Sequence, residues 1–193
     1  MLTAAIVGTG NIAPEHIEGL LTFPRRCKIT ALCDIYPEKA VHLKEKYQLD
    51  CEIFSDYKEM LSSDTPIDIV HVCTPPFTHA EIAIHAMNAG KNVLVEKPMA
   101  TCLAECDEML AAEKRNGVVL GCIAQNRFRN SIAKLKTMLD SGTAGSLRVA
   151  HVNSFWWRGH SYYDLWWRGL WEKEGGGCTL NHAVHHIDMI NWL

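Results

Sequence analysis

The chain has 193 residues, of which 48% are hydrophobic and 21% are charged, a composition typical of folded globular proteins rather than disordered ones. The formal net charge of -3, with Lys and Arg spread along the chain, provides no basic patch for nucleic acid or an anionic membrane surface. No apolar run approaches the roughly 18 to 20 residues that a spanning helix needs, and no basic segment precedes the first apolar run. We therefore expect a cytoplasmic protein that binds neither nucleic acid nor membranes.

The first part of the chain alternates between apolar runs and helical patterns. Strands are predicted at 3–7, 28–34, 67–73, 92–96 and 118–124. Helices are predicted at 15–21, at 37–47, from Thr78 to Met87 and from Thr101 to near Gly117. Thr78 and Glu81 have the spacing of a capping box, and Gly90 suits a helix end. Strands that alternate with helices indicate a doubly wound parallel sheet, because parallel connections need long crossovers.

The pattern changes near residue 125. An amphipathic helix is predicted at 129–142 and a long strand at 146–157, and a loop rich in tryptophan follows. We expect a Rossmann-like domain at 1–124 and an incomplete substrate and oligomerisation domain at 125–193. Residues 125–193 are few for a domain with an independent hydrophobic core. We therefore also expect that the chain is truncated.

The eight cysteines include no CxxC pair, and most stand in apolar, strand-like segments. Free thiols that pack as small hydrophobic side chains explain this pattern better than disulfides or a zinc site. We expect no metal to bind them.

A glycine turn between the first strand and the first helix matches the dinucleotide fingerprint G-x-G-x-x-G/A at residues 8–13. Gly8 would permit the tight turn, Gly10 would let the backbone approach a pyrophosphate, and Asn11 and Ile12 complete the turn. Asp34 ends the second strand, where an acid accepts hydrogen bonds from a ribose and repels a 2′-phosphate. The pattern favours NAD over NADP; the alternative is that the glycines only turn the chain.

Several motifs together resemble the Gfo/Idh/MocA oxidoreductases. They are the GxGxxA turn, TPPFTH at 74–79, EKP at 96–98, and three glycines followed by His185 and Asp188. The resemblance covers essentially the whole chain, and it implies a Rossmann domain followed by an α+β substrate domain with a mostly antiparallel sheet. It also implies an oxidoreductase with a sugar-like small-molecule substrate.

The resemblance assigns roles residue by residue. It implies that Thr74, Pro75 and His79 lie along the cofactor, with Glu96 near the nicotinamide ribose. Lys97 would touch the reacting hydroxyl while His185 exchanges its proton, a coherent pair for acid–base catalysis because nearby positive charge and desolvation lower the pKa of a lysine. Further expected site residues are Trp167 and Arg168 at the cofactor, and Asn181 and Tyr163 at the substrate. Arg127 matches a family position near the domain junction, where its role is either structural or substrate-binding. Asn181 stands where many relatives have aspartate, as in a subset resembling nucleotide-sugar dehydrogenases.

The segment GGGCTLNHAVHHID at 175–188 admits three interpretations: a metal site, a capped core helix, or a substrate-site helix in which His185 is catalytic. His182 and His186 are four residues apart, as in HExxH zinc proteins, but the glutamate of that motif is absent. We favour the substrate-site helix.

Five of the six tryptophans stand in the loop at 151–171, which suits stacking on a sugar or, equally, a core or subunit interface. A homo-oligomer is expected. The main hypothesis is an NAD(P)-dependent dehydrogenase of a sugar, cyclitol or sugar nucleotide. The alternative is an NAD-binding module without turnover, in a regulatory or interaction role.

Overall fold

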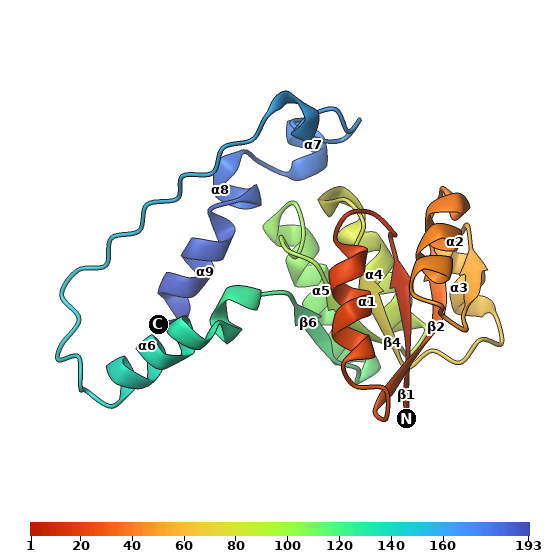
Figure 1. The fold of residues 1–193 in the computed structure, drawn as a ribbon, viewed down its shortest axis with the longest axis horizontal. Coiled ribbons are helices and arrows are strands. Elements are labelled where there is room, and N and C mark those ends of the chain that lie inside the picture. The colour runs from red at the N-terminus through yellow and green to blue at the C-terminus, as the bar shows by residue number, and fades with distance from the viewer. The chain divides into compact units, whose positions relative to one another are not determined.

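The computed structural model describes residues 1–193 and divides them into two compact units, Met1–Cys122 and Ile123–Leu193. We call them the first and second unit and describe each by itself (Figure 1). The first unit is a six-stranded parallel sheet with helices on both faces, which confirms the predicted doubly wound fold.

The sheet has the strand order β3-β2-β1-β4-β5-β6, in which the direction of strand addition reverses at β1. Its strands are β1 (Leu2–Val7), β2 (Cys27–Cys33), β3 (Glu52–Phe54), β4 (Ile69–Val72), β5 (Asn92–Val95) and β6 (Leu120–Cys122). In such sheets ligands bind beyond the carboxyl ends of the strands at the reversal point. The candidate ligand-binding residues are therefore those that follow β1, β2, β4 and β5.

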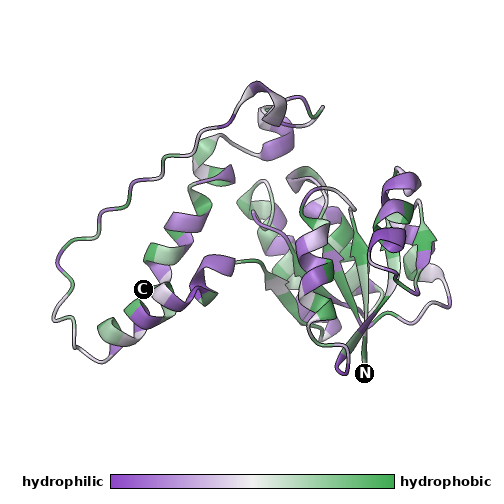
Figure 2. Cartoon of the chain, viewed as in Figure 1, coloured by the Kyte–Doolittle hydropathy of each residue, from purple (hydrophilic) through white to green (hydrophobic).

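Two apolar layers hold the helices against the sheet. The helices are α1 (Ala13–Leu21), α2 (Pro37–Lys46), α3 (Tyr57–Ser62), α4 (His79–Asn88) and α5 (Leu103–Asn116). Alternate residues of a strand point to opposite faces, so Val7 packs with α3, α4 and α5, whereas Ile6 packs with α1 and α2. The hydropathy colours of Figure 2 show the strands as mainly apolar between these helices.

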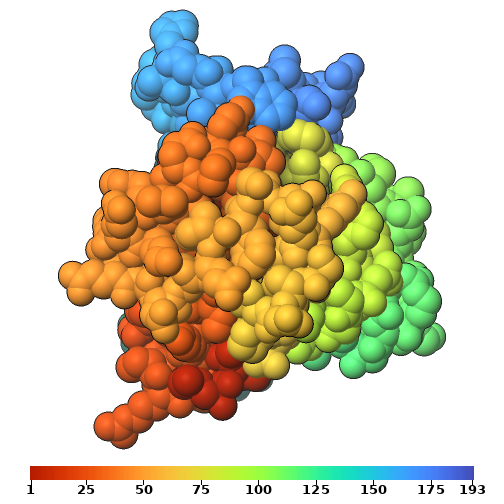
Figure 3. All heavy atoms as spheres, turned by 90° about the vertical axis from the view of Figure 1, so that its right-hand side faces the viewer, coloured from red at the N-terminus to blue at the C-terminus, as the bar shows by residue number.

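The segment between α2 and β4 contains two elements that the sequence pattern did not reveal. β3 is only a three-residue edge strand, and α3 begins after Asp56, whose side chain accepts a hydrogen bond from the Lys58 backbone N–H at 2.7 Å. Together with α2 they form much of the face seen in Figure 3, where they run from orange to yellow. Such short elements carry too few residues for a periodic pattern.

The ends of α4 and α5 test the capping predictions. Gly90 and Gly117 adopt φ of 73° and 64° after the two helices, as predicted for helix-ending glycines. The predicted capping box is wrong, because the Thr78 side chain caps no backbone N–H of α4. Its hydroxyl lies 2.7 Å from Thr74 Oγ1 and 2.8 Å from the Pro75 carbonyl oxygen. Glu81 instead accepts from the Tyr57 hydroxyl at 2.7 Å, because α3 packs beside α4.

The second unit consists of helices and loops. Its elements are η2 (Gln125–Phe128), α6 (Asn130–Asp140), η3 (His160–Tyr162), α7 (Trp171–Glu174), α8 (Cys178–Asn181) and α9 (Val184–Trp192). The helix predicted at 129–142 is confirmed as α6, but residues 146–157 form no strand. A strand requires a hydrogen-bonded neighbour, and residues 123–193 provide none.

All eight cysteines are free thiols; Cys33, Cys51 and Cys73 are buried, whereas Cys102, Cys122 and Cys178 are exposed. The prediction of buried thiols therefore holds for only part of the set. None of the helices combines the length and the apolar character required to cross a membrane.

Candidate functional site

The turn after β1 depends on Gly8. Its φ of +91° is unfavourable for residues with a side chain, and its backbone N–H donates to the Cys33 carbonyl at 2.8 Å. A Cβ at this position would lie 2.7 Å from the Cys73 carbonyl carbon and from the Thr74 nitrogen. Gly8 is therefore required for close packing of the turn against the end of β4.

Gly10 has a different role, because a Cβ built on it meets nothing within 4 Å. Gly10 and Asn11 are exposed, and Ile12, at the N-cap of α1, provides no side-chain cap. The N–H groups of the first turn of a helix attract an anion when nothing caps them. In α1 the Ala13 and Glu15 N–H groups donate to the Gly10 and Ile12 carbonyl oxygens at 3.1 Å, so the open space beside Gly10 is the feature that fits the pyrophosphate of a dinucleotide.

Asp34, the residue after β2, ties the glycine turn to the second strand. Its Oδ2 accepts from the Thr9 backbone N–H at 2.7 Å and from the Thr9 hydroxyl at 2.9 Å, and its Oδ1 accepts from the Tyr36 N–H at 3.0 Å. An ionised carboxylate has about four acceptor positions. The half-buried side chain retains acceptor capacity at the edge where an adenosine ribose would lie, and exposed Ile35 brings no positive charge for a 2′-phosphate.

Glu96 and Lys97 follow β5 at the same edge of the sheet. Glu96 is 7% exposed; its Oε1 lies 3.1 Å from His16 Nε2, and its Oε2 accepts from the Lys97 backbone N–H at 3.1 Å. Burial alone would raise the pKa of the Glu96 carboxyl, but the hydrogen bond and charge of His16 and the Lys97 N–H outweigh it and hold this pKa below its ordinary value. Glu96 is therefore an ionised carboxylate at neutral pH.

His79, at the start of α4, connects the loops that follow β4 and β5. It is fully buried, with Nδ1 2.8 Å from the Pro98 carbonyl oxygen and Nε2 2.8 Å from the Thr74 carbonyl oxygen. Both ring nitrogens contact the protein backbone, so the side chain positions the two loops. Thr74 and Pro75 are half-buried at the loop surface.

Two histidines of this region were missed by sequence reasoning. His16 lies on α1 and His71 on β4, and their Nδ1 atoms are 2.9 Å apart in the interior. The sequence signal was limited to a histidine at an apolar position of a helix, His16, and another in a buried strand, His71. Such a signal does not identify the side chain to which each histidine is hydrogen-bonded.

In the second unit, Arg168 lies in an aromatic and acidic cage. Its guanidinium carbon is 4.1 Å from the Tyr162 ring centroid and 4.3 Å from that of Trp167, and Nη1 is 3.3 Å from Glu174 Oε1. Glu174 is buried and accepts from the Gly169 N–H at 2.8 Å. Tyr163 is half exposed and packs edge-on against Tyr162. Trp167 and Arg168, expected at the cofactor, thus belong to an ordered cluster of this unit.

The histidine segment forms α8, a short turn and α9. His185 is buried on α9 with its ring 6.3 Å from that of Trp156, and the His182 Nε2 lies 3.1 Å from the Tyr162 hydroxyl. The Asn181 side chain donates to the Gly176 carbonyl at 3.0 Å. No three His, Cys, Asp or Glu side chains converge in the manner of a metal site.

Arg127 forms a two-pronged ion pair with Asp188 of α9. Its Nε donates to Asp188 Oδ2 at 2.9 Å, and Nη2 pairs with Oδ1. The pair joins η2 to α9 and gives Arg127 a structural role, one of the roles that its position near the domain junction allowed.

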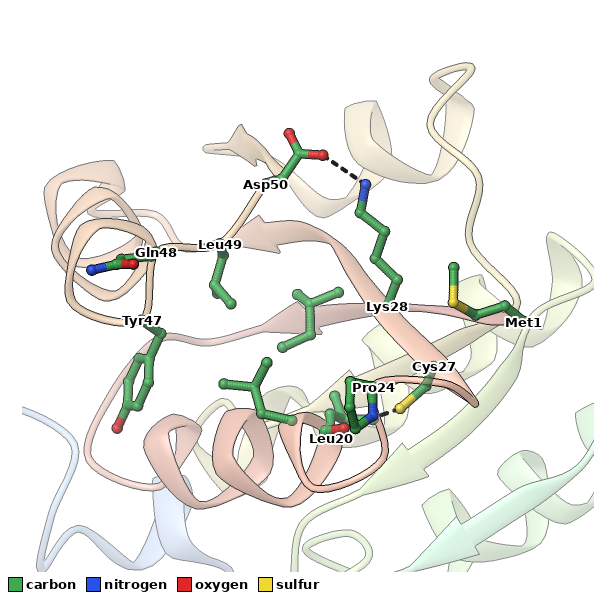
Figure 4. A pocket seen from close by; sticks show the side chains of 11 residues that line it. Met1, Leu20, Pro24, Cys27, Lys28, Tyr47, Gln48, Leu49 and Asp50 are labelled. Atoms are coloured by element: carbon green, nitrogen blue, oxygen red, sulfur yellow. Dashed lines mark hydrogen bonds and ion pairs between the residues drawn. The ribbon is translucent and has the colours of Figure 1, made fainter.

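A hollow lies in each unit. One, of about 260 Å³, is lined by residues near the start of β2 and the end of α2, among them Cys27, Tyr47 and Leu49 (Figure 4). The other, of about 590 Å³, lies in the second unit between Phe155, Trp156, Trp157 and His182. The first is at the amino end of β2 and so has no part in the site described above.

Comparisons with known proteins identify the first unit as an NAD-binding Rossmann fold. Residues 2–123 match the model of an oxidoreductase family described as having an NAD-binding Rossmann fold, and residues 132–193 match a C-terminal domain of Gfo/Idh/MocA proteins. The chain is 28% identical over 193 residues to inositol 2-dehydrogenase of Salmonella typhimurium, covering 100% of the chain and 54% of that protein. The chain thus spans about half the length of the curated relatives it matches.

Solved structures give the same result. The WlbA dehydrogenase of Bordetella pertussis, in complex with NADH and UDP-GlcNAcA, has a TM-score of 0.92 and 34% identity over 100% of this chain and 55% of its own. Myo-inositol 2-dehydrogenase of Lactobacillus plantarum has a TM-score of 0.69 and 29% identity over 75% of this chain and 42% of its own. The predicted NAD-binding Rossmann fold is confirmed, and the chain belongs to the Gfo/Idh/MocA oxidoreductase family.

Proposed function

We propose that the chain carries the cofactor-binding and catalytic residues of an NAD-dependent oxidoreductase that acts on a secondary alcohol of a sugar, cyclitol or sugar nucleotide. The observation that carries this proposal is the grouping of functional residues at one edge of the parallel sheet. The glycine turn and Asp34 follow β1 and β2, and Glu96 and Lys97 follow β5.

The residues would share the work of binding. Gly10, Asn11 and Ile12 would receive the pyrophosphate, and Asp34 the adenosine ribose. Glu96 would accept a hydrogen bond from the nicotinamide ribose. Thr74, Pro75 and His79 would line the cofactor site beside it. Trp167 and Arg168 would complete the cofactor site.

Proton transfer would be the task of Lys97 and His185. Bound NAD would supply the hydride acceptor. The Lys97 ammonium would donate a hydrogen bond to the alcohol oxygen, and His185 would accept the proton that the alcohol loses. Asn181, Tyr163 and, less directly, Arg127 would hold the substrate in place.

Among the three substrate classes, a sugar nucleotide is favoured. The dehydrogenase solved with UDP-GlcNAcA has a TM-score of 0.92 and 34% identity, whereas two inositol dehydrogenase structures have TM-scores of 0.69 and 0.80 with 29% and 21% identity. Arg158 and Arg168 stack on aromatic rings in the second unit, and arginine is well suited to anionic groups such as phosphates. A mostly antiparallel sheet in the substrate domain stays a proposal.

We also propose self-association and a cytoplasmic location. Phe155, Trp157 and Trp171 are 89%, 88% and 73% exposed, which favours a protein partner such as a second copy. Eight free thiols suit a reducing compartment. Sedimentation of the chain over a concentration series tests the first point: a constant monomer mass would contradict it.

A second candidate function is a module that binds NAD without turnover. The observation that favours it is the lack of any strand within residues 123–193, because closure of a substrate domain excludes water and positions the reactants.

One experiment separates the two. Calorimetric titration with NADH and NADPH measures binding, and a panel of UDP-sugars, free sugars and inositols with NAD then measures NADH formation. NADH binding with turnover on a panel member supports the oxidoreductase. Binding without turnover favours the module, and no binding of either nucleotide refutes both.

A further inference from the structure

The polar chain that runs from β4 through α1 to β5 is the least expected feature of the interior. His71, His16 and Glu96 come from three separate elements and are only 6%, 8% and 7% exposed. The two imidazole rings meet edge to face at 75°, and a 3.1 Å contact leads on from His16 to Glu96. A buried polar group is costly unless it is hydrogen-bonded, so this arrangement needs a physical reason.

The hydrogen positions follow from the contacts. The Glu96 carboxylate can only accept, so His16 Nε2 must carry a hydrogen. Between the two Nδ1 atoms, 2.9 Å apart, one must donate and the other accept. Burial, and then the charge of His16, lower the pKa of His71 to about 4, so His71 is neutral at pH 7 and presents one ring nitrogen as donor and the other as acceptor.

Among the groups near Glu96, His16 is the main one that offsets the cost of burying the charged carboxylate. The titratable groups that face Glu96 are His16 from α1, Cys73 from the end of β4, His79 from α4 and adjacent Lys97. Burial raises the pKa of Cys73 far above its ordinary value, so this thiol is neutral, and both ring nitrogens of His79 contact carbonyl oxygens. Only His16 and Lys97 donate to Glu96 among the hydrogen bonds described above.

We propose that His16 is a positioning residue that keeps Glu96 ionised and fixed against the backbone of Lys97, and that His71 holds the His16 ring in the required orientation. Its consequence rests on the proposed function, in which Glu96 accepts from the nicotinamide ribose. Without His16 the buried carboxylate would take up a proton at a higher pH, and the ribose would lose a charged acceptor.

Three variants test the network without any cofactor. His16→Gln keeps an amide N–H near the place of Nε2, whereas His16→Leu removes the donor; neither side chain titrates. Urea unfolding gives the folding equilibrium constant of each variant. At pH 7.5 this constant should be about tenfold or more larger for His16→Gln than for His16→Leu. At pH 4.5 the ratio of the two constants should be smaller, because Glu96 of the Leu variant is then protonated. In a Glu96→Gln background the pH dependence of this ratio should vanish. A ratio that does not change with pH would overturn the proposal.

The consequence for the site is measured by NADH affinity as a function of pH. As pH falls, the NADH affinity of the parent and of His16→Gln should decrease over a similar pH range. The NADH affinity of His16→Leu should begin to decrease at a higher pH. Superimposable profiles for all three would overturn the positioning role. If the parent binds no NADH at any pH, the proposed function fails, while the unfolding comparison still decides the network.

A His16→Leu chain that does not fold is also informative. An uncompensated buried charge would be the cause, so adding Glu96→Gln must restore folding. Failure of this rescue would contradict the proposal.

Discussion

The two glycines of the turn after β1 should separate stability from cofactor binding. Gly8→Ala forces a side chain into a φ of +91° and places its Cβ 2.7 Å from backbone atoms of Cys73 and Thr74. The positive φ costs about 1–2 kcal/mol, and insertion of a methyl group into packed atoms about 1–3 kcal/mol more. The free energy of unfolding should therefore fall by roughly 2–5 kcal/mol, a large part of the stability of an ordinary domain.

Gly10→Ala is the matched control, because its Cβ meets nothing within 4 Å. Its free energy of unfolding should stay within about 1 kcal/mol of the parent, whereas NADH affinity should fall about tenfold or more because the methyl group enters the pyrophosphate space. Urea unfolding followed by far-ultraviolet circular dichroism gives the stabilities, and calorimetry gives the affinities. A Gly8→Ala chain as stable as the parent, or a Gly10→Ala chain with full NADH affinity, would refute the reasoning.

Three other predictions concern single side chains. Asp34→Ala should narrow the preference for NADH over NADPH, since it removes the carboxylate that repels a 2′-phosphate; an unchanged ratio of the two dissociation constants would argue against the ribose role. Lys97→Ala should lower turnover by ~10²-fold or more with NADH affinity within severalfold, while Lys91→Ala, before the amino end of the same strand, should leave turnover intact. Because burial lowers the pKa of His71 from 6.5 to about 4, the unfolded chain takes up a proton there first, so the folded state loses up to about 3 kcal/mol as pH falls from 6.5 to 4. His71→Gln should remove this part of the acid sensitivity of unfolding and exposed His42→Gln should not; equal pH slopes for both variants would count against a neutral buried His71.

Sequence alone determined the features that depend on short-range pattern. The strand and helix periods of residues 1–124 predicted the parallel sheet, and the glycine spacing with Asp34 predicted the turn that the structure forms. The Glu96-Lys97-Pro98 motif was placed correctly at a strand end. These features follow from residues close together in the chain, whose spacing can be read directly.

Only the tertiary structure decided which side chains meet. His16 contacts His71 and Glu96 across 55 and 80 residues of sequence, and Glu81 bonds to Tyr57 on a neighbouring helix in place of the predicted capping box. The apolar alternation at 146–157 predicted a strand that does not form, because a strand is stabilised by a hydrogen-bonded partner and not by its own pattern. Local pattern therefore located the glycine turn and the carboxyl ends of the parallel strands, whereas packing of distant elements decided how the charged groups there are held.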